Sequence, residues 1–134
     1  MAEKDWFVDW FNTSYYHILY QNRNESEAKE FIINLMNHLG LNSDSKILDL
    51  ACGKGRHSKT LNDLGFEVLG VDLSENSIRE AQKWSSDSLS FQVHDMRNRI
   101  PNRQFNAIFN LFTSFGYFDT FEQNQLVCKA MFQM

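Results

Sequence analysis

The sequence predicts an α/β protein built on a doubly wound parallel sheet, and three observations support this class. Four short apolar runs are typical of buried strands, at residues 46–50, 66–74, 89–96 and 104–112. Segments with helical periodicity or helix caps lie between or after these runs. Strands that alternate with helices imply βαβ units, which place parallel strands between two layers of helices.

The first part of the chain is expected to be helical. Residues 5–11, "DWFVDWF", place four aromatic side chains on one face of a short helix. Asn24 can cap a second helix, Glu27 can complete a capping box, and Gly40 suits the end of that helix. We therefore expect residues 1–45 to form an N-terminal helical cap or lid.

The remaining segments predict the alternation directly. Residues 56–65 suit a helix that ends at Gly65, and Ser74 can cap the helix that follows the second strand. Residues 120–134 begin another helix after the fourth strand, where the sequence stops. We therefore expect residues 46–134 to form an α/β domain that is truncated after strand four.

Length and composition fit one domain without a metal site. The 134 residues suffice for a single core, and a net charge of -4 with a pI near 5.5 argues against a nucleic-acid partner. Cys52 and Cys128 lie far apart, so neither a zinc site nor a disulfide framework is indicated. No run approaches the roughly 20 apolar residues of a membrane span, and no signal-peptide run opens the chain. We expect a cytoplasmic protein that does not bind membranes.

Three predicted strands each end at or near an aspartate: Asp49, Asp72 and Asp95. The carboxyl ends of parallel strands share one edge of the sheet, which is where open α/β sheets bind ligands. Gly53 and Gly55 follow the first aspartate and permit a sharp turn that a ligand can approach closely. Three carboxylates at one edge are costly without donors. A ligand with an ammonium, hydroxyls and an adenine amino group would satisfy them.

These stretches resemble the cofactor motifs of class I S-adenosylmethionine-dependent methyltransferases, of the generic bacterial methyltransferase-domain type. The resemblance runs from about residue 7 to the C-terminus and rests on "ILDLACGKGRHS", "VLGVDLS", "FQVHDMRN" and "FNAIFNLFTSFGYF". It implies a Rossmann-like fold, S-adenosyl-L-methionine as the cofactor, and transfer of its methyl group to an acceptor.

The resemblance also implies roles for the first motif. Asp49 would lie near the ammonium end of the cofactor's methionine part. The turn around it would be formed by Ala51, Cys52, Gly53 and Gly55. Ala51 stands where many members have glycine, a change that the family tolerates. Cys52 is expected to serve as a small residue in the turn, because methyl transfer from a sulfonium needs no protein nucleophile.

The later motifs would complete the cofactor site. Asp72 would accept the ribose hydroxyls, with Leu73 beside the adenine. Asp95 would receive the adenine amino group, and Met96 would flank the ring. The alternatives are that Asp72 caps a helix, a task that Ser74 can perform, and that Asp95 is a solvated loop acid.

Two further groups of residues complete the predicted site. Asn110 and Leu111 would line the mouth through which the methyl group is transferred, whereas Tyr16 and Tyr20 would contribute to a lid over the cofactor or simply to aromatic packing. No catalytic residue is assigned. His94 more often packs or donates a hydrogen bond than acts as a base at such a position.

The fourth strand bears on the acceptor and on assembly. It ends "NLFTS" and lacks the Asn/Asp-Pro-Pro-aromatic run of enzymes that methylate amino groups of adenine or glutamine, so a small-molecule acceptor is expected. Such domains usually have seven strands, and an apolar open edge promotes association. We therefore expect the half-sheet to be incomplete as an enzyme or to be completed by another chain, such as a homo-oligomer partner at this edge.

Two other functions remain open. A nicotinamide-dependent oxidoreductase would carry Gly-x-Gly-x-x-Gly, but Ser58 stands at the third glycine. An acid at the end of the first strand is also atypical for that class. The second alternative is a cofactor-binding module without catalysis, or an inactive fragment. Binding of S-adenosylmethionine rather than NADH would separate the two cofactor classes.

Overall fold

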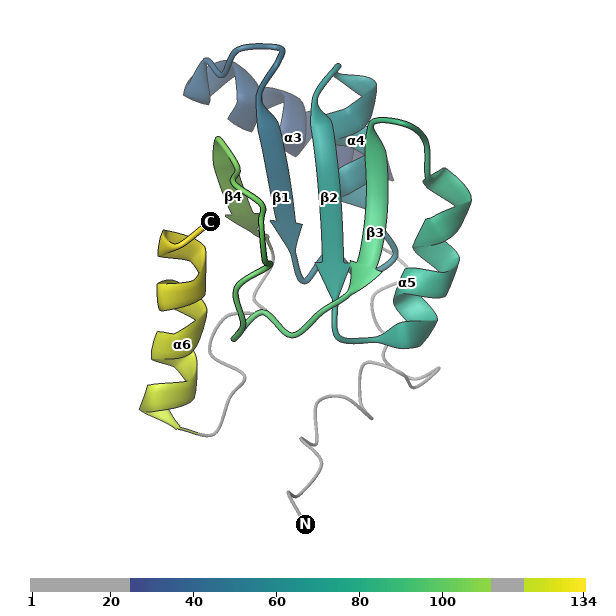
Figure 1. Ribbon diagram of the computed structural model, residues 1–134. Coiled ribbons are helices and arrows are strands. Elements are labelled where there is room, and N and C mark those ends of the chain that lie inside the picture. The colour runs from purple at the N-terminus through teal and green to yellow at the C-terminus, as the bar shows by residue number, and fades with distance from the viewer. Residues whose placement is uncertain (1–24, 112–119) are drawn as a thin grey trace.

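The computed structural model describes residues 25–111 and 120–134. Its centre is a four-stranded sheet in the order β3-β2-β1-β4, with all pairs parallel. The strands are β1 (Lys46–Leu50), β2 (Glu67–Asp72), β3 (Leu89–Val93) and β4 (Ala107–Asn110). In Figure 1 the four arrowheads point the same way, so the carboxyl ends share one edge of the sheet. The predicted parallel α/β class is confirmed.

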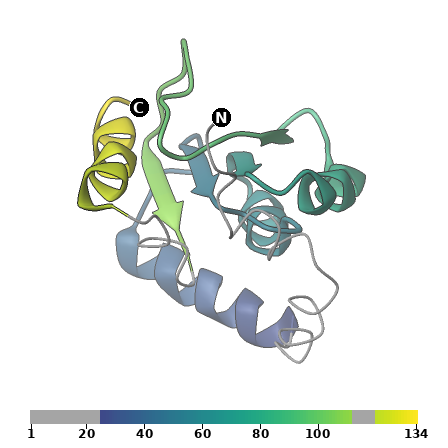
Figure 2. The ribbon, with the colours of Figure 1, turned by 90° about the horizontal axis from the view of Figure 1, so that it is seen from below.

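Helices cover both faces of this sheet (Figures 1 and 2). The helical elements are α3 (Glu25–Leu39), α4 (Arg56–Asp63), α5 (Glu75–Ala81), the 3-10 turn η1 (Gln82–Trp84) and α6 (Phe121–Phe132). α3, α4 and α5 pack on one face, where Ile32, Leu61 and Ile78 join the same buried cluster as Ile47 and Phe91. α6 packs on the other face, where Ala130 lies with Leu48 and Val71.

The strand order places a reversal beside β1. The chain moves outward from β1 to β2 and β3, and then crosses to β4 on the other side of β1. In open α/β sheets, the crevice at the carboxyl ends of the two strands that flank such a reversal is the usual ligand site. The reversal therefore directs attention to the ends of β1 and β4.

The predicted helix ends agree with the structure. Gly40 and Gly65 follow α3 and α4 with φ of +62° and +103°, a region that glycine adopts without steric cost. Ser74 caps α5, and its Oγ accepts a hydrogen bond from the Ser77 N–H at 3.2 Å. Strands β3 and β4 are shorter than the predicted runs. The predicted helix at 5–11 and the Asn24 cap lie outside the described residues.

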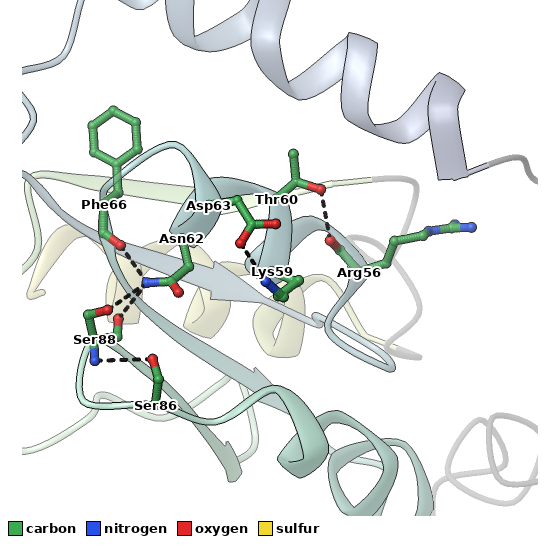
Figure 3. A network of polar contacts seen from close by, with 8 residues as sticks. All are labelled: Arg56, Lys59, Thr60, Asn62, Asp63, Phe66, Ser86 and Ser88. Carbon is green, nitrogen blue, oxygen red and sulfur yellow. Dashed lines mark hydrogen bonds and ion pairs between the residues drawn. The ribbon is translucent and has the colours of Figure 1, made fainter.

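A polar network fixes the far end of α4, away from the carboxyl edge (Figure 3). The Asn62 side-chain amide donates to the Phe66 carbonyl at 2.9 Å and to the Ser88 carbonyl and hydroxyl at 3.2 and 2.9 Å. One side chain thereby joins the C-terminus of α4 to the starts of β2 and β3. This anchoring fixes the position of α4, whose other end reaches the candidate site.

Neither a membrane span nor a metal centre is found in the part of the chain that the structure describes. None of the helices in residues 25–111 and 120–134 combines the length and the apolar character needed to cross a bilayer. Over the same residues, no three His, Cys, Asp or Glu side chains are grouped as metal ligands would be.

Candidate functional site

The turn after β1 has an unusual backbone. Ala51, Gly53 and Gly55 have φ of +58°, +58° and +81°, in the left-handed region. This conformation costs a residue with a Cβ about 1–2 kcal/mol. The position of Ala51 is therefore better suited to glycine than to alanine. The Cys52 N–H donates to the Val71 carbonyl at 2.9 Å and ties the strained turn to β2.

The two glycines of the turn face different surroundings. A Cβ added to Gly53 would meet no atom within 4 Å, so a ligand can approach this side of the turn. A Cβ on Gly55 would lie 2.6 Å from Cε1 of Phe91. Gly55 therefore serves the packing of the turn on β3, whereas Gly53 leaves open the side on which a ligand would lie.

Asp49 lies beneath this turn as a buried carboxyl group. Its exposed fraction is 2%, and the Ser58 hydroxyl of α4 donates to its Oδ2 at 2.6 Å. Burial raises the pKa of Asp49 to about 7, the Ser58 hydrogen bond opposes this shift, and the nearby Asp72 charge adds to it. Near neutral pH, Asp49 therefore exists partly protonated and partly ionised, so a cation would bind its ionised form.

Asp72 connects the end of β2 to the turn. Its Oδ2 accepts from the Gly53 N–H at 2.8 Å, and its Oδ1 accepts from the Ser74 N–H at 2.8 Å. Burial raises the pKa of Asp72, while the N–H donors of Ser74 and Gly53 lower it. Because Ser74 caps α5, Asp72 does not serve as the cap and is instead the acceptor that holds the turn against β2.

Asp95 forms an ion pair with Arg97, two residues later in the chain. The Arg97 side chain donates through Nε to Oδ1 at 3.0 Å and through Nη2 to Oδ2 at 2.6 Å, and the Arg97 N–H also donates to Oδ1 at 3.0 Å. Partial burial raises the pKa of Asp95, but the hydrogen bonds and charge of Arg97 outweigh it and hold that pKa below its usual value. Asp95 is thus ionised and already paired, unlike the other two acids.

Asn110 joins the segments on either side of the strand-order reversal. Its amide donates to the Leu50 carbonyl at the end of β1 at 3.2 Å and lies 3.9 Å from Sδ of Met96. Leu111 is partly buried against the cluster that also contains Ile47. The structure thus brings Asn110 and Met96 together at the carboxyl edge, while Leu111 contacts the core beside them.

The other residues that the sequence singles out are Cys52, His94 and Leu73, and the pair Tyr16 and Tyr20. Cys52 is partly buried, and burial raises the pKa of its thiol well above the usual value, so the thiol stays protonated. The His94 Nε2 lies 2.8 Å from the Asn98 carbonyl, which occupies that ring nitrogen. Leu73 is partly buried directly after Asp72. Tyr16 and Tyr20 lie outside the described residues.

Sequence reasoning missed two partners of the predicted acids. Ser58 was considered only as a departure from a glycine pattern, although a small hydroxyl residue on the buried side of the helix after the turn could have suggested a partner for Asp49. Arg97 follows Asp95 by two residues, and an acid and a base so close together could have suggested their pairing.

The acceptor groups at this edge fit a ligand that carries an ammonium and hydroxyl groups, as an adenosyl amino acid does. Asp49 offers a desolvated carboxyl group to a cation, and Asp72, which accepts backbone N–H groups of Gly53, Leu73 and Ser74, retains capacity for a hydroxyl donor. A Cβ on Gly53 would meet no atom, so a ligand can approach the turn on that side. The edge can therefore bind an ammonium and hydroxyl groups.

Comparison with known proteins identifies methyltransferases as relatives of this chain. Residues 47–133 match the family described as "Methyltransferase domain". The chain is 35% identical over 79 residues to dTDP-3-amino-3,4,6-trideoxy-alpha-D-glucopyranose N,N-dimethyltransferase from Streptomyces venezuelae. The aligned region covers 59% of this chain and 33% of that protein. It is 30% identical over 73 residues to a ubiquinone biosynthesis O-methyltransferase from Albidiferax ferrireducens, covering 54% and 25% respectively.

A solved structure shows the same architecture. An S-adenosylmethionine-dependent methyltransferase from Clostridium acetobutylicum superposes with a TM-score of 0.71 at 28% identity, covering 87% of this chain and 48% of that one. The chain thus spans about a third or less of the two curated relatives and about half of the solved relative.

Proposed function

The chain belongs to the class I S-adenosylmethionine-dependent methyltransferases, and from this premise we propose that its carboxyl edge binds S-adenosyl-L-methionine for transfer of the methyl group to a small-molecule acceptor. The observation that carries the proposal is the proximity of the Asp49 and Asp72 carboxyl groups at the ends of adjacent strands, beside a turn that is open to a ligand at Gly53. Two desolvated acids at one edge need a ligand with cationic and hydroxyl donors.

Each acid at the edge would bind a different part of the cofactor. Asp49 would receive the ammonium, and Asp72 would receive the ribose hydroxyls through the acceptor capacity that its backbone hydrogen bonds leave unused. Asp95, already held by Arg97, would offer its remaining capacity to the adenine amino group. Leu73 and Met96, both partly buried, would flank the adenine ring.

When bound, the sulfonium of the cofactor supplies an electrophilic methyl group. The task of this chain is then to hold the cofactor in one orientation and to keep water away from the reacting centre. Asn110 supports this role, because its amide fixes the end of β1 and the Met96 side chain with respect to β4. Ala51, Cys52 and Leu111 would contribute the packed surface around the methionine part.

The names of the relatives support the small-molecule acceptor. One relative is named for N-methylation of a nucleotide-linked amino sugar, and another for O-methylation in ubiquinone biosynthesis. One name indicates methylation at nitrogen and the other at oxygen, so the proposal extends to both kinds of acceptor atom. The acidic composition agrees with this choice and with a cytoplasmic location.

Parts outside the α/β core would complete the enzyme. We propose that the residues before α3 form a cap, with Tyr16 and Tyr20 over the cofactor, whereas α3 itself packs on the sheet through Ile32. The β4 edge is the proposed contact for another strand or a second copy, because β4 pairs with β1 and has no further neighbour among the described strands. Phe121 and Phe132 of α6 are 73% and 93% exposed and offer further apolar area for such a contact.

The proposal can be tested by calorimetry followed by a labelled-methyl assay. S-adenosylmethionine and S-adenosylhomocysteine should bind, whereas NADH should not. Asp72→Ala should abolish binding, and Asp63→Ala, which removes an exposed acid of α4, should not change it. Binding of NADH alone, or equal affinity in Asp72→Ala, would contradict the proposal. Binding without methyl transfer to a panel of amines and alcohols would favour the non-catalytic module.

A further inference from the structure

Ser58 is a buried polar residue of α4 whose hydroxyl group donates a hydrogen bond to Asp49. Ser58 is the third residue of α4, and its exposed fraction is 0%. Its hydroxyl donates to the Asp49 carboxylate rather than to the helix backbone. Among the described residues, it is the one hydrogen-bond donor that reaches this carboxylate. A buried polar pair in an apolar cluster is costly to assemble, so it calls for a specific role.

The neighbouring strand makes room for this hydrogen bond. Gly70 of β2 is the register partner of Asp49 in β1. A Cβ on Gly70 would lie 2.8 Å from Oγ of Ser58 and 2.7 Å from Cδ1 of Phe91. A side chain at this position would displace the hydroxyl or the ring. The glycine, the serine and the aspartate therefore form one arrangement contributed by β2, α4 and β1.

The electrostatic surroundings of Asp49 favour its protonated form. Burial disfavours the carboxylate, Asp72 from β2 adds a like charge, and Cys52 from the turn contributes only a protonated thiol. From α4 come the Ser58 hydroxyl and the positive end of the helix. On the outer side of α4, Lys59 pairs with Asp63. Ser58 is thus the side chain that opposes protonation of Asp49.

We propose that Ser58 is a positioning residue for cofactor binding, whose hydroxyl orients the Asp49 carboxyl group and favours its ionised form for the cofactor's ammonium. This inference rests on the proposed function. A protonated Asp49 offers no charge to an ammonium, so binding requires the carboxylate, and the proton that leaves Asp49 passes to solvent. Removing the hydroxyl should therefore weaken binding most at low pH and least at high pH.

The test compares Ser58→Ala with Thr60→Ala as a matched control. Thr60 lies two residues further along α4, and its hydroxyl donates to the Arg56 carbonyl of the same helix rather than to Asp49 (Figure 3). Carbon-13 NMR would follow the Asp49 carboxyl group in the ligand-free protein. Its midpoint, near pH 7 in the parent chain, should rise by about one pH unit in Ser58→Ala and stay unchanged in Thr60→Ala.

Calorimetry with S-adenosylhomocysteine gives the second measurement. For a one-unit shift, Ser58→Ala should bind about tenfold more weakly at pH 6 and less than about twofold more weakly at pH 8.5. Ser58→Cys keeps the side-chain shape, with a somewhat larger atom that is a poor donor, and should show the same pH trend, which provides a second variant if Ser58→Ala unfolds.

The outcomes separate the two proposals. An unchanged Asp49 midpoint, or a loss of affinity that is equal at every pH, would make Ser58 a packing residue and overturn the inference. A shifted midpoint with unaltered affinity would also overturn it, because Asp49 would then not meet the ligand. If the parent chain binds no adenosyl compound, the proposed function fails, and the cofactor role of Ser58 fails with it.

Discussion

The end of β3 is built differently from the ends of β1 and β2. Asp49 and Asp72 are desolvated, their pKa values are raised, and their hydrogen-bond donors are hydroxyl or backbone N–H groups without charge. Asp95 is more accessible, its pKa is lowered, and a bidentate arginine neutralises it. The first two acids thus lack a cation among the described residues, whereas the third has its own.

This difference indicates where the binding free energy resides. A ligand with an ammonium and hydroxyl groups relieves the electrostatic cost at the ends of β1 and β2. At the end of β3 the same ligand gains less, because the Arg97 guanidinium already satisfies most of the carboxylate. Substitutions at the first two ends should therefore change affinity strongly, and substitutions at the third should change it weakly.

The largest effect is expected for Asp72→Asn. At least one of its backbone N–H partners, such as Gly53 or Ser74, would face an amide NH2 instead of an oxygen, and the negative charge would be lost. Hydrogen bonds to charged groups contribute about 1.5–3 kcal/mol, so affinity for S-adenosylhomocysteine should fall by about 100-fold. Calorimetry measures this change, with Asp63→Asn as the control. A loss below fivefold would contradict the assigned role of Asp72.

Asp49→Asn should separate stability from binding. The folded-state pKa of Asp49, about 7, exceeds its ordinary value of 3.8, so the folded chain binds more protons than the unfolded chain between these values. The resulting stabilisation is complete below about pH 4 and is lost as the pH rises through about 7. Asp49→Asn should therefore be more stable than the parent at pH 8, by a few kcal/mol at most.

The same variant should bind S-adenosylhomocysteine at least about tenfold more weakly at pH 8, because the ammonium loses its counter-charge. Urea unfolding at pH 5 and pH 8 measures the first effect, and calorimetry measures the second. A variant less stable than the parent at pH 8 would show that the Asp49 carboxylate is not under electrostatic strain in the ligand-free protein.

Local sequence signals were sufficient for the parallel α/β class and several helix ends. Runs of apolar residues ending in an acid predicted β1 and β2, and a serine before an acidic residue predicted the cap of α5. These signals depend on neighbours within a few positions, which the sequence displays directly. The sequence also indicated which acids meet at one edge, because parallel strands share the direction of their ends.

The pairing of side chains could not be predicted in the same way. The Ser58–Asp49 hydrogen bond depends on the register of β1 with β2, which places Gly70 opposite Asp49 and leaves space for the hydroxyl. Register and helix rotation result from packing of the whole sheet and are not encoded in one motif. The different roles of Gly53 and Gly55 were hidden for the same reason, since Phe91 lies 36 residues beyond Gly55.

Gly70→Ala and Gly53→Ala should act on different properties. The added methyl group at Gly70 would meet Ser58 and Phe91 within 3 Å, and overpacking of this kind costs about 1–3 kcal/mol of unfolding free energy. At Gly53 the methyl group meets nothing, so only the left-handed backbone cost of about 1 kcal/mol applies, while ligand approach is obstructed. Urea unfolding and calorimetry on both variants measure the two effects. Equal stability losses would contradict this distinction.

The smallest effect is expected for Arg97→Gln at the end of β3. The Arg97 and Asp95 side chains retain 18% and 21% of their exposure, and removal of a partly solvated pair should cost no more than about 1 kcal/mol of unfolding free energy. Asp95 would keep its charge and one backbone donor, so affinity for S-adenosylhomocysteine should change by less than about threefold. A double-mutant cycle with Asp95→Asn measures the coupling. A tenfold loss of affinity in Arg97→Gln alone would mean that the guanidinium orients Asp95 for the adenine, and the ends of the three strands would then contribute alike.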